Sequence, residues 1–153
     1  MKNAYALGVS LAIGIAEQKN GPGSKEEYNQ QAGLFAQSIR EMSRILKMTG
    51  GKECNISYGA GDLYVTIFGG RTRKIGTLLG LGLPFEQALQ KLNGVTLESV
   101  AIAKIVTETL KMQEIQGKLD TKQFPLLMHI YDLITGKTTV NIPWQLFEEE
   151  TAS

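Results

Sequence analysis

The chain opens with a segment in which apolar side chains occupy nearly every side of a helix. Between residues 2 and 18 these positions are Ala4, Tyr5, Leu7, Val9, Leu11, Ile13, Ile15 and Ala16. A helix that is apolar all round lies inside a core. The run is too short to span a bilayer, and no clear small-residue cleavage site follows it. The pattern therefore predicts a central core helix, against which neighbours pack closely at Gly8 and Gly14.

A second helix, with one apolar face, is expected after the loop at residues 20–23. Ser24 and Glu27 have the spacing of a capping box, which marks a helix start. The apolar positions that follow are three and four residues apart, as in an amphipathic helix: Tyr28, Ala32, Phe35, Ile39, Met42 and Leu46. Gly50 and Gly51 are expected to end this helix.

Residues 63–68 are ambiguous, because their β-branched and aromatic side chains favour a strand by propensity. No other run in the chain makes a convincing partner strand, and a lone strand leaves its backbone unpaired. We therefore expect this segment to be helical.

The rest of the chain reads as further helices, one of them long, separated by glycine and proline. They are expected over residues 73–81, 84–92 with Pro84 first, 96–115 opened by Thr96, and 124–134, with a last short turn over 143–147 and a solvated end from Glu148. Trp144 is expected to pack this turn onto the bundle, and Phe35, Met42 and Phe124 to lie in the core. The fold class predicted is all-α, as one helical bundle domain over residues 1–153.

Composition agrees with an ordinary soluble domain and narrows the partners. Apolar residues make up 42% of the chain, and 16 basic against 15 acidic residues give a net charge of +1. A balance so close to neutral predicts no nucleic-acid partner. With Cys54 as the only cysteine, no disulfide within the chain and no cysteine-rich metal site can form, which favours a reduced cytoplasmic protein. The single histidine, His129, lies among apolar residues and is expected to pack rather than catalyse.

Candidate chemistry gathers between Gly59 and Lys74. This stretch carries one acid, two threonine hydroxyls and three cations among glycines, a composition suited to a small polar anion. Asp62 and Thr66 are four residues apart, which places them on one face of a helix. Arg71 is the best candidate for a phosphate, because a guanidinium offers a planar fork of donors. Gly80 and Gly82 resemble a fragment of a dinucleotide motif, but the third glycine and a preceding strand are missing.

The order of several short motifs resembles one family. Those motifs are Lys2-Asn3, Ala32-Gly33-Leu34, Arg40-Glu41-Met42, Gly61-Asp62-Leu63 with Thr66, Gly69-Gly70-Arg71-Thr72-Arg73-Lys74, Asn93 to Glu98, Phe124-Pro125-Leu126 and Gly136-Lys137. Together they resemble the C-terminal, substrate-binding domain of NAD-dependent glycerol-3-phosphate dehydrogenase over almost the whole chain. The resemblance implies a helical bundle of the kind shared with 6-phosphogluconate dehydrogenase. It also implies interconversion of sn-glycerol 3-phosphate and dihydroxyacetone phosphate with NAD, a step that makes a phospholipid precursor.

The resemblance assigns catalytic roles to three positions. Lys2 matches the family's catalytic lysine, and Asp62 and Thr66 match residues that line the active site. Oxidation of a secondary alcohol needs a base for the hydroxyl proton, and a lysine serves only if burial or neighbouring cations depress its pKa. Asp62 is expected to orient that lysine. Without the family, Lys2 would read as a solvated terminal lysine, and Asp62 with Thr66 as a solvated pair.

Four further positions are implied to bind ligands. Asn3 matches a substrate-binding asparagine, and Arg71 matches an arginine between the substrate phosphate and the cofactor. Thr72 stands where many members carry asparagine, so its contact with the phosphate is a weaker match. Glu98 matches a Glu or Gln that contacts the cofactor, although a first-turn glutamate also complements a helix dipole. Arg73 and Lys74 are expected to strengthen the local positive field.

In this family a Rossmann domain precedes the helical domain and holds most of the NAD, and this chain contains no such domain. The start at Met1 suggests a cut protein or a shortened reading frame, and the isolated chain is expected to be inactive. A homodimer is also implied. Two alternatives stay open: a helical interaction or oligomerisation module without catalysis, and a related dehydrogenase acting on another hydroxy acid. The Gly-Gly-Arg-x-Arg-Lys run favours a phosphorylated substrate over the second alternative.

Overall fold

The computed structural model describes residues 1–25, 28–94 and 97–147. All regular structure in these ranges is helical, so the all-α prediction is confirmed. The α-helices are α1 (Lys2–Asn20), α2 (Tyr28–Met48), α3 (Ile56–Thr66), α4 (Gly70–Gly80), α5 (Phe85–Lys91), α6 (Glu98–Ile115) and α7 (Pro125–Ile134). Short 3-10 turns lie at Glu53–Asn55, Thr121–Gln123 and Trp144–Phe147.

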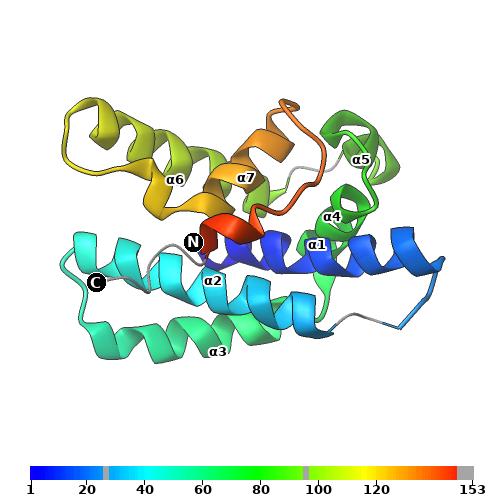
Figure 1. Cartoon of the computed structure of the whole chain (residues 1–153), viewed down its shortest axis with the longest axis horizontal. Coiled ribbons are helices and arrows are strands. Elements are labelled where there is room, and N and C mark those ends of the chain that lie inside the picture. The colour runs from blue at the N-terminus through cyan, green and yellow to red at the C-terminus, as the bar shows by residue number, and fades with distance from the viewer. Residues whose placement is uncertain (26–27, 95–96, 148–153) are drawn as a thin grey trace.

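Helix α1 runs through the middle of the molecule, as its apolar pattern predicts. Figure 1 shows α2 and α3 on one side of it, and α4 to α7 on the other. Helix α1 contacts α2, α3, α4, α6 and α7, and every residue from Ala4 to Gly14 is buried. Among the described residues, no helix is both long enough and apolar enough to cross a membrane.

Close contact between α1 and α4 depends on glycines from both helices. A Cβ atom added at Gly14 would overlap the backbone of Thr77 and Leu81, and one added at Gly80 would overlap the backbone of Leu11. Gly8 allows a similar approach by Ile130 of α7, whose Cδ1 would lie 2.7 Å from an added Cβ. The close packing expected at Gly8 and Gly14 is therefore confirmed, and it fixes α4 against α1.

The ambiguous segment at residues 63–68 is mostly helical, as expected. Helix α3 ends at Thr66, and the chain then turns through Phe68 into α4. Only Leu63 is buried within the helix. Tyr64 is 56% exposed and packs edge-to-face on Phe35 of α2 and on Phe68. The aromatic side chains that suggested a strand thus cover one side of a surface helix.

The face of α2 that meets the core differs from the predicted apolar stripe. Tyr28 is 71% exposed and Ala32 is also exposed, so both were wrongly assigned to that face. Met42 is buried as expected, while Phe35 is only partly covered. The buried residues are Leu34, Gln37, Ser38, Glu41 and Met42, which repeat at helical spacing but are mostly polar.

Glu41 explains why α2 buries polar side chains. Its carboxylate is fully buried and accepts hydrogen bonds from the Tyr5 hydroxyl at 3.0 Å and the Gln37 amide at 2.8 Å. It also accepts from the backbone N–H groups of Leu126 and Leu127 at 2.8 and 3.0 Å, in the first turn of α7. One side chain therefore ties α2 to α1 and α7. Burial raises the pKa of Glu41 to about 7, against these four hydrogen bonds, which lower it.

The predicted helix boundaries hold with small shifts. Pro84 precedes the first residue of α5 instead of being that residue, and α6 begins at Glu98. Glu27 and Thr96, which completed the expected caps, lie outside the described residues, as does the end from Glu148. The Ser24 hydroxyl donates to the carbonyl of Ala16 at 3.2 Å.

Trp144 packs on α2 as expected, although it remains 37% exposed. A Cβ at Gly33 would lie 2.9 Å from its ring, and Phe147 stacks edge-to-face beside it. Phe124 is fully buried, which confirms its core assignment.

Candidate functional site

The clearest site feature is an ion pair between the start of α1 and the middle of α3. Lys2 Nζ lies 2.5 Å from Asp62 Oδ2, although the residues are far apart in sequence. The pair is only partly covered, with the Lys2 side chain 38% and the Asp62 side chain 54% exposed. Lys2 can stand there because the middle of α1 is held in the core, while the first turn that carries Lys2 lies nearer the surface. The structure therefore brings together two of the three predicted catalytic residues.

Thr66 shares the helix with Asp62, but its hydroxyl is already engaged. Thr66 Oγ1 donates to the backbone carbonyl of Asp62 at 2.7 Å, a common bond for a threonine inside a helix. The oxygen keeps its capacity to accept a hydrogen bond, and the residue is half-buried. Thr66 can thus accept a hydrogen bond from a ligand hydroxyl without leaving its present rotamer.

Arg71 and Thr72 lie in the first turn of α4. Gly69 precedes the helix, and Gly70 has a φ of 78°, in the left-handed region that favours glycine. The turn places Arg71 in an exposed position at the positive end of the helix dipole, where the first N–H groups of a helix have no partner within the helix. Helix α4 thus begins at Gly70, three residues before the predicted start at Arg73. The guanidinium of Arg71 and the N–H groups of this helix start are both of the kind that binds anions.

Arg73 is turned away from Arg71 by the helical repeat. Its Nη1 donates to the carbonyl of Ile67 at 3.0 Å, which ties α4 to the turn that precedes it. Together with Lys74 it lines a separate cavity towards α1 and α5. Arg73 therefore has a structural contact that the basic run alone did not predict.

Glu98 lies in the first turn of α6 and interacts electrostatically with the start of α1. Burial lowers the pKa of the Met1 amino group, and the charge of Glu98 opposes that shift. Glu98 itself is exposed, and Asn3 is half-buried beside Lys2 in the chain. The starts of α1 and α6 therefore bring Glu98 into the same neighbourhood as Lys2.

The remaining reactive side chains lie elsewhere. Cys54 is a free, exposed cysteine in the turn before α3. His129 is buried in α7, and its Nε2 accepts a hydrogen bond from the backbone N–H of Asn141 at 3.3 Å, which agrees with the packed role expected for it. Within the described ranges, no group of three His, Cys, Asp or Glu side chains is placed to hold a metal ion.

Comparison with known proteins places these residues in a family context. Residues 1–144 match the family model described as the C-terminus of NAD-dependent glycerol-3-phosphate dehydrogenase. The glycerol-3-phosphate dehydrogenase [NAD(P)+] of Chlamydia pneumoniae is 31% identical over 132 residues, which is 84% of this chain and 38% of the relative. The enzyme of the same description from Halothermothrix orenii is 32% identical over 138 residues, or 88% of this chain and 36% of the relative.

An archaeal relative is also similar. The NADP(+)-dependent glycerol-3-phosphate dehydrogenase of Archaeoglobus fulgidus is 32% identical over 94 residues, covering 60% of this chain and 27% of the relative. The matched part of the chain thus covers 27% to 38% of the length of these curated relatives. Since the family model covers nearly the whole chain, the chain belongs to the family of C-terminal domains of NAD-dependent glycerol-3-phosphate dehydrogenases.

Proposed function

We propose that this chain is the substrate-binding and catalytic domain of a glycerol-3-phosphate dehydrogenase. It would interconvert sn-glycerol 3-phosphate and dihydroxyacetone phosphate with NAD, once a Rossmann domain supplies most of the cofactor site. The observation that carries the proposal is the ion pair between Lys2 and Asp62. Folding brings together Lys2, which would act as the base, and Asp62, whose carboxylate would orient it.

In this proposal Lys2 transfers the proton. During reduction its ammonium group donates a proton to the carbonyl oxygen of dihydroxyacetone phosphate, and during oxidation the free amine accepts the hydroxyl proton. Asp62 holds the Lys2 side chain in one orientation, since its carboxylate lies 2.5 Å from Nζ. The Thr66 hydroxyl oxygen accepts a hydrogen bond from a substrate hydroxyl. Asn3, next to Lys2, donates its side-chain amide to the substrate.

The phosphate group would bind at the start of α4. Arg71 is exposed there and supplies a planar pair of N–H donors. Thr72, in the same turn, adds a hydroxyl and a backbone N–H. The dipole of an 11-residue helix adds positive potential at this end. Charge at one end and the Lys2–Asp62 pair at the other would orient the three-carbon substrate.

The residues that face the cofactor are Arg71 and Glu98, both exposed. When bound, the nicotinamide accepts or delivers the hydride. A carboxylate at Glu98 suits the amide or ribose hydroxyls of such a cofactor, because it accepts hydrogen bonds from both. Its place beside the start of α1 supports contact with a cofactor that lies near Lys2.

A fusion protein tests the proposal. The chain is joined behind the N-terminal part of the Chlamydia pneumoniae relative that precedes its matched region. We expect the fusion to oxidise NADH when dihydroxyacetone phosphate is added, measured by NADH absorbance. Lys2→Met, Asp62→Asn and Arg71→Ala should each abolish most of the rate, whereas Lys52→Ala, an exposed lysine far along the chain, should not.

The result that would overturn the proposal is a folded fusion that binds NADH yet shows no turnover, while the intact relative is active under the same conditions. The interaction-module alternative predicts that outcome. A specific observation favours it: Ile105, Met112 and Ile115 leave an apolar stripe on α6, with exposures of 64%, 62% and 87%. Sedimentation of the chain measures self-association independently of catalysis, and also tests the homodimer implied by the family resemblance.

A further inference from the structure

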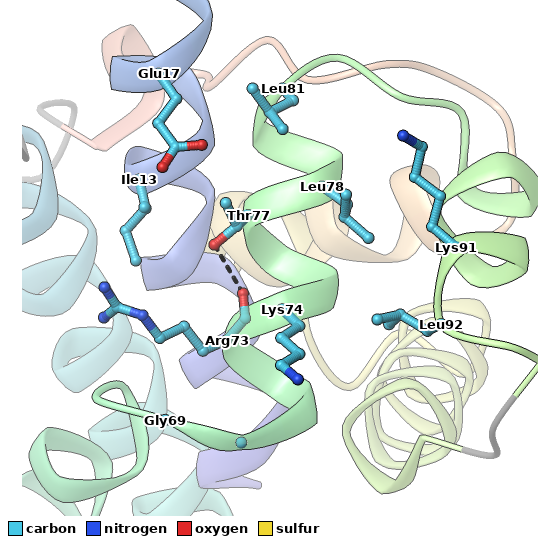
Figure 2. Close-up of a pocket in the computed structure, with 11 residues that line it drawn as sticks. Ile13, Glu17, Gly69, Arg73, Lys74, Thr77, Leu78, Leu81, Lys91 and Leu92 are labelled. Carbon is cyan, nitrogen blue, oxygen red and sulfur yellow. Dashed lines mark hydrogen bonds between the residues drawn. The ribbon is translucent and has the colours of Figure 1, made fainter. Parts of the chain in front are cut away.

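A cavity of about 640 Å³ lies between α1, α4 and α5, and neither Lys2, Asp62 nor Arg71 lines it. Figure 2 shows α4 in the middle, with Glu17 on the α1 side and Lys91 and Leu92 on the α5 side. Its volume falls in the range of sites for small organic ligands. The cavity is therefore a candidate site beyond the proposed function.

The lining carries an excess of positive charge. Arg73, Lys74 and Lys91 face one acid, Glu17, so the formal charges favour an anionic ligand. Through their side chains, Lys74 and Lys91 form no ion pair or hydrogen bond within the part of the chain that the structure describes. Their ammonium groups are exposed and available to a ligand. Gly69 and Gly70 also line the cavity, so the positive end of the α4 dipole adds to the same field.

The lining also has an apolar part. Leu78 of α4 lies opposite the Lys91 side chain, Leu92 lies lower in the view near the level of Lys74, and Leu81 follows Leu78 one turn later along the chain (Figure 2). Lys74 lies in α4 with Leu78, and Lys91 is the last residue of α5, directly before Leu92. A ligand that satisfies the whole lining therefore joins an anionic group to an apolar body. The charged group of the ligand should lie near the two lysines. It should lie away from Glu17, which is on the α1 side of the cavity (Figure 2).

We propose that this cavity binds a phosphate monoester whose organic part is apolar, with Lys74 and Lys91 holding the phosphate and Leu78 and Leu92 contacting the organic part. A phosphate dianion matches the excess of two positive charges in the lining. Lysines bind phosphate as point charges and do not need the bidentate geometry of an arginine. Arg73, fixed by its bond to Ile67, contributes to the field without moving.

Calorimetric titration of the whole chain with phenyl phosphate and with inorganic phosphate tests the proposal. We expect phenyl phosphate to bind more tightly, because only it can use the apolar wall. Lys74→Ala combined with Lys91→Ala should lower the affinity for phenyl phosphate by about tenfold or more, because charge-assisted contacts are lost. Glu17→Gln should strengthen binding, because it removes the only negative charge of the lining.

Two variants separate this cavity from other sources of binding. Lys52→Ala combined with Lys118→Ala removes the same charge from exposed positions outside the cavity and should leave the affinity unchanged. Arg71→Ala should weaken phosphate binding at the proposed active site. It should leave the affinity of the cavity for phenyl phosphate unchanged. The proposal is overturned if the natively folded chain binds no phenyl phosphate, if the control pair loses as much affinity as the cavity pair, or if only Arg71→Ala weakens binding.

Discussion

Tyr5 of α1 donates a hydrogen bond to the carboxylate of Glu41 in α2 at 3.0 Å, in a core where neither residue is exposed. Tyr5 lies one helical turn after Lys2, so this bond fixes the rotation of α1 close to the candidate site. Burial raises the pKa of Tyr5 well above its usual range, and the charge of Glu41 and this hydrogen bond raise it further. The buried acid therefore connects the stability of the fold to the position of the catalytic lysine proposed above.

Glu41 should make stability depend on pH. Its pKa is raised from 4.5 to about 7 in the folded chain, so between these pH values the folded state holds a proton that the unfolded state has released. The free energy of unfolding should therefore fall as pH rises through this window, by about 3 kcal/mol for this one group. Urea unfolding at a series of pH values measures the slope.

Glu41→Gln isolates this contribution because glutamine does not titrate. The variant should lose the slope, and it should be less stable at low pH because an amide N–H₂ replaces one acceptor oxygen among four donors. The difference between the two proteins cancels the opposite effect of His129, whose pKa is lowered by burial. Glu86→Gln, at an exposed position, should keep the original slope. An unchanged slope in Glu41→Gln would refute the prediction.

Helix periodicity predicted most of this fold, and the exceptions have a physical cause. The 3.6-residue repeat locates α1 and α2 because apolar spacing is local information. The same repeat predicted the wrong buried face for α2, because a glutamate such as Glu41 is expected at the surface unless its hydrogen-bond partners are known. Three of the four partners of Glu41 lie 36, 85 and 86 residues away in sequence, so only the folded chain reveals them.

The candidate site likewise has a part that could be predicted from the sequence and a part that could not. Motif order pointed to Lys2, Asp62 and Arg71, yet no local pattern brings Lys2 and Asp62 to 2.5 Å. That distance depends on how α3 packs against α1. The charge-lined cavity also could not be predicted from the sequence, because Lys91 and Lys74 line the same cavity only after α5 folds back towards α4. Spacing along one helix can be predicted from sequence, whereas contacts between helices depend on packing.

Lys2 and Asp62 should act as one unit in the active fusion. Asp62→Asn removes the carboxylate that holds Lys2, and Lys2→Met removes the proton donor, so each should lower kcat by about 10²–10⁴, the usual contribution of acid–base catalysis. The double variant should lose little more than either single variant, because groups that act together are not additive. Steady-state rates with dihydroxyacetone phosphate measure this, and fully additive losses would show that the two residues act separately.

Gly14 should tolerate no side chain. In Gly14→Ala the new Cβ would lie 2.5 Å from Leu81 N and would overlap the Thr77 carbonyl, both backbone atoms that cannot rotate away. Forcing α4 from α1 should cost about 3 kcal/mol of unfolding free energy. Gly61→Ala is the matched control, since Gly61 lies within α3 with open space around it and should gain about 0.5–1 kcal/mol. Thermal unfolding compares them, and equal stabilities would contradict the close approach.

The buried hydroxyl of Thr107 offers a route to higher stability. Thr107 is fully buried in α6, and its Oγ1 has no hydrogen-bond partner among the described residues. Thr107→Val keeps the shape and the branching of the side chain while removing an unsatisfied polar group, so it should raise the free energy of unfolding by about 1 kcal/mol. Thr109→Val makes the same change two residues later, where the hydroxyl is exposed and donates to the Ile105 carbonyl at 2.8 Å. Chemical denaturation should show a gain for Thr107→Val alone, and a loss there would mean that the hydroxyl has a partner such as a buried water.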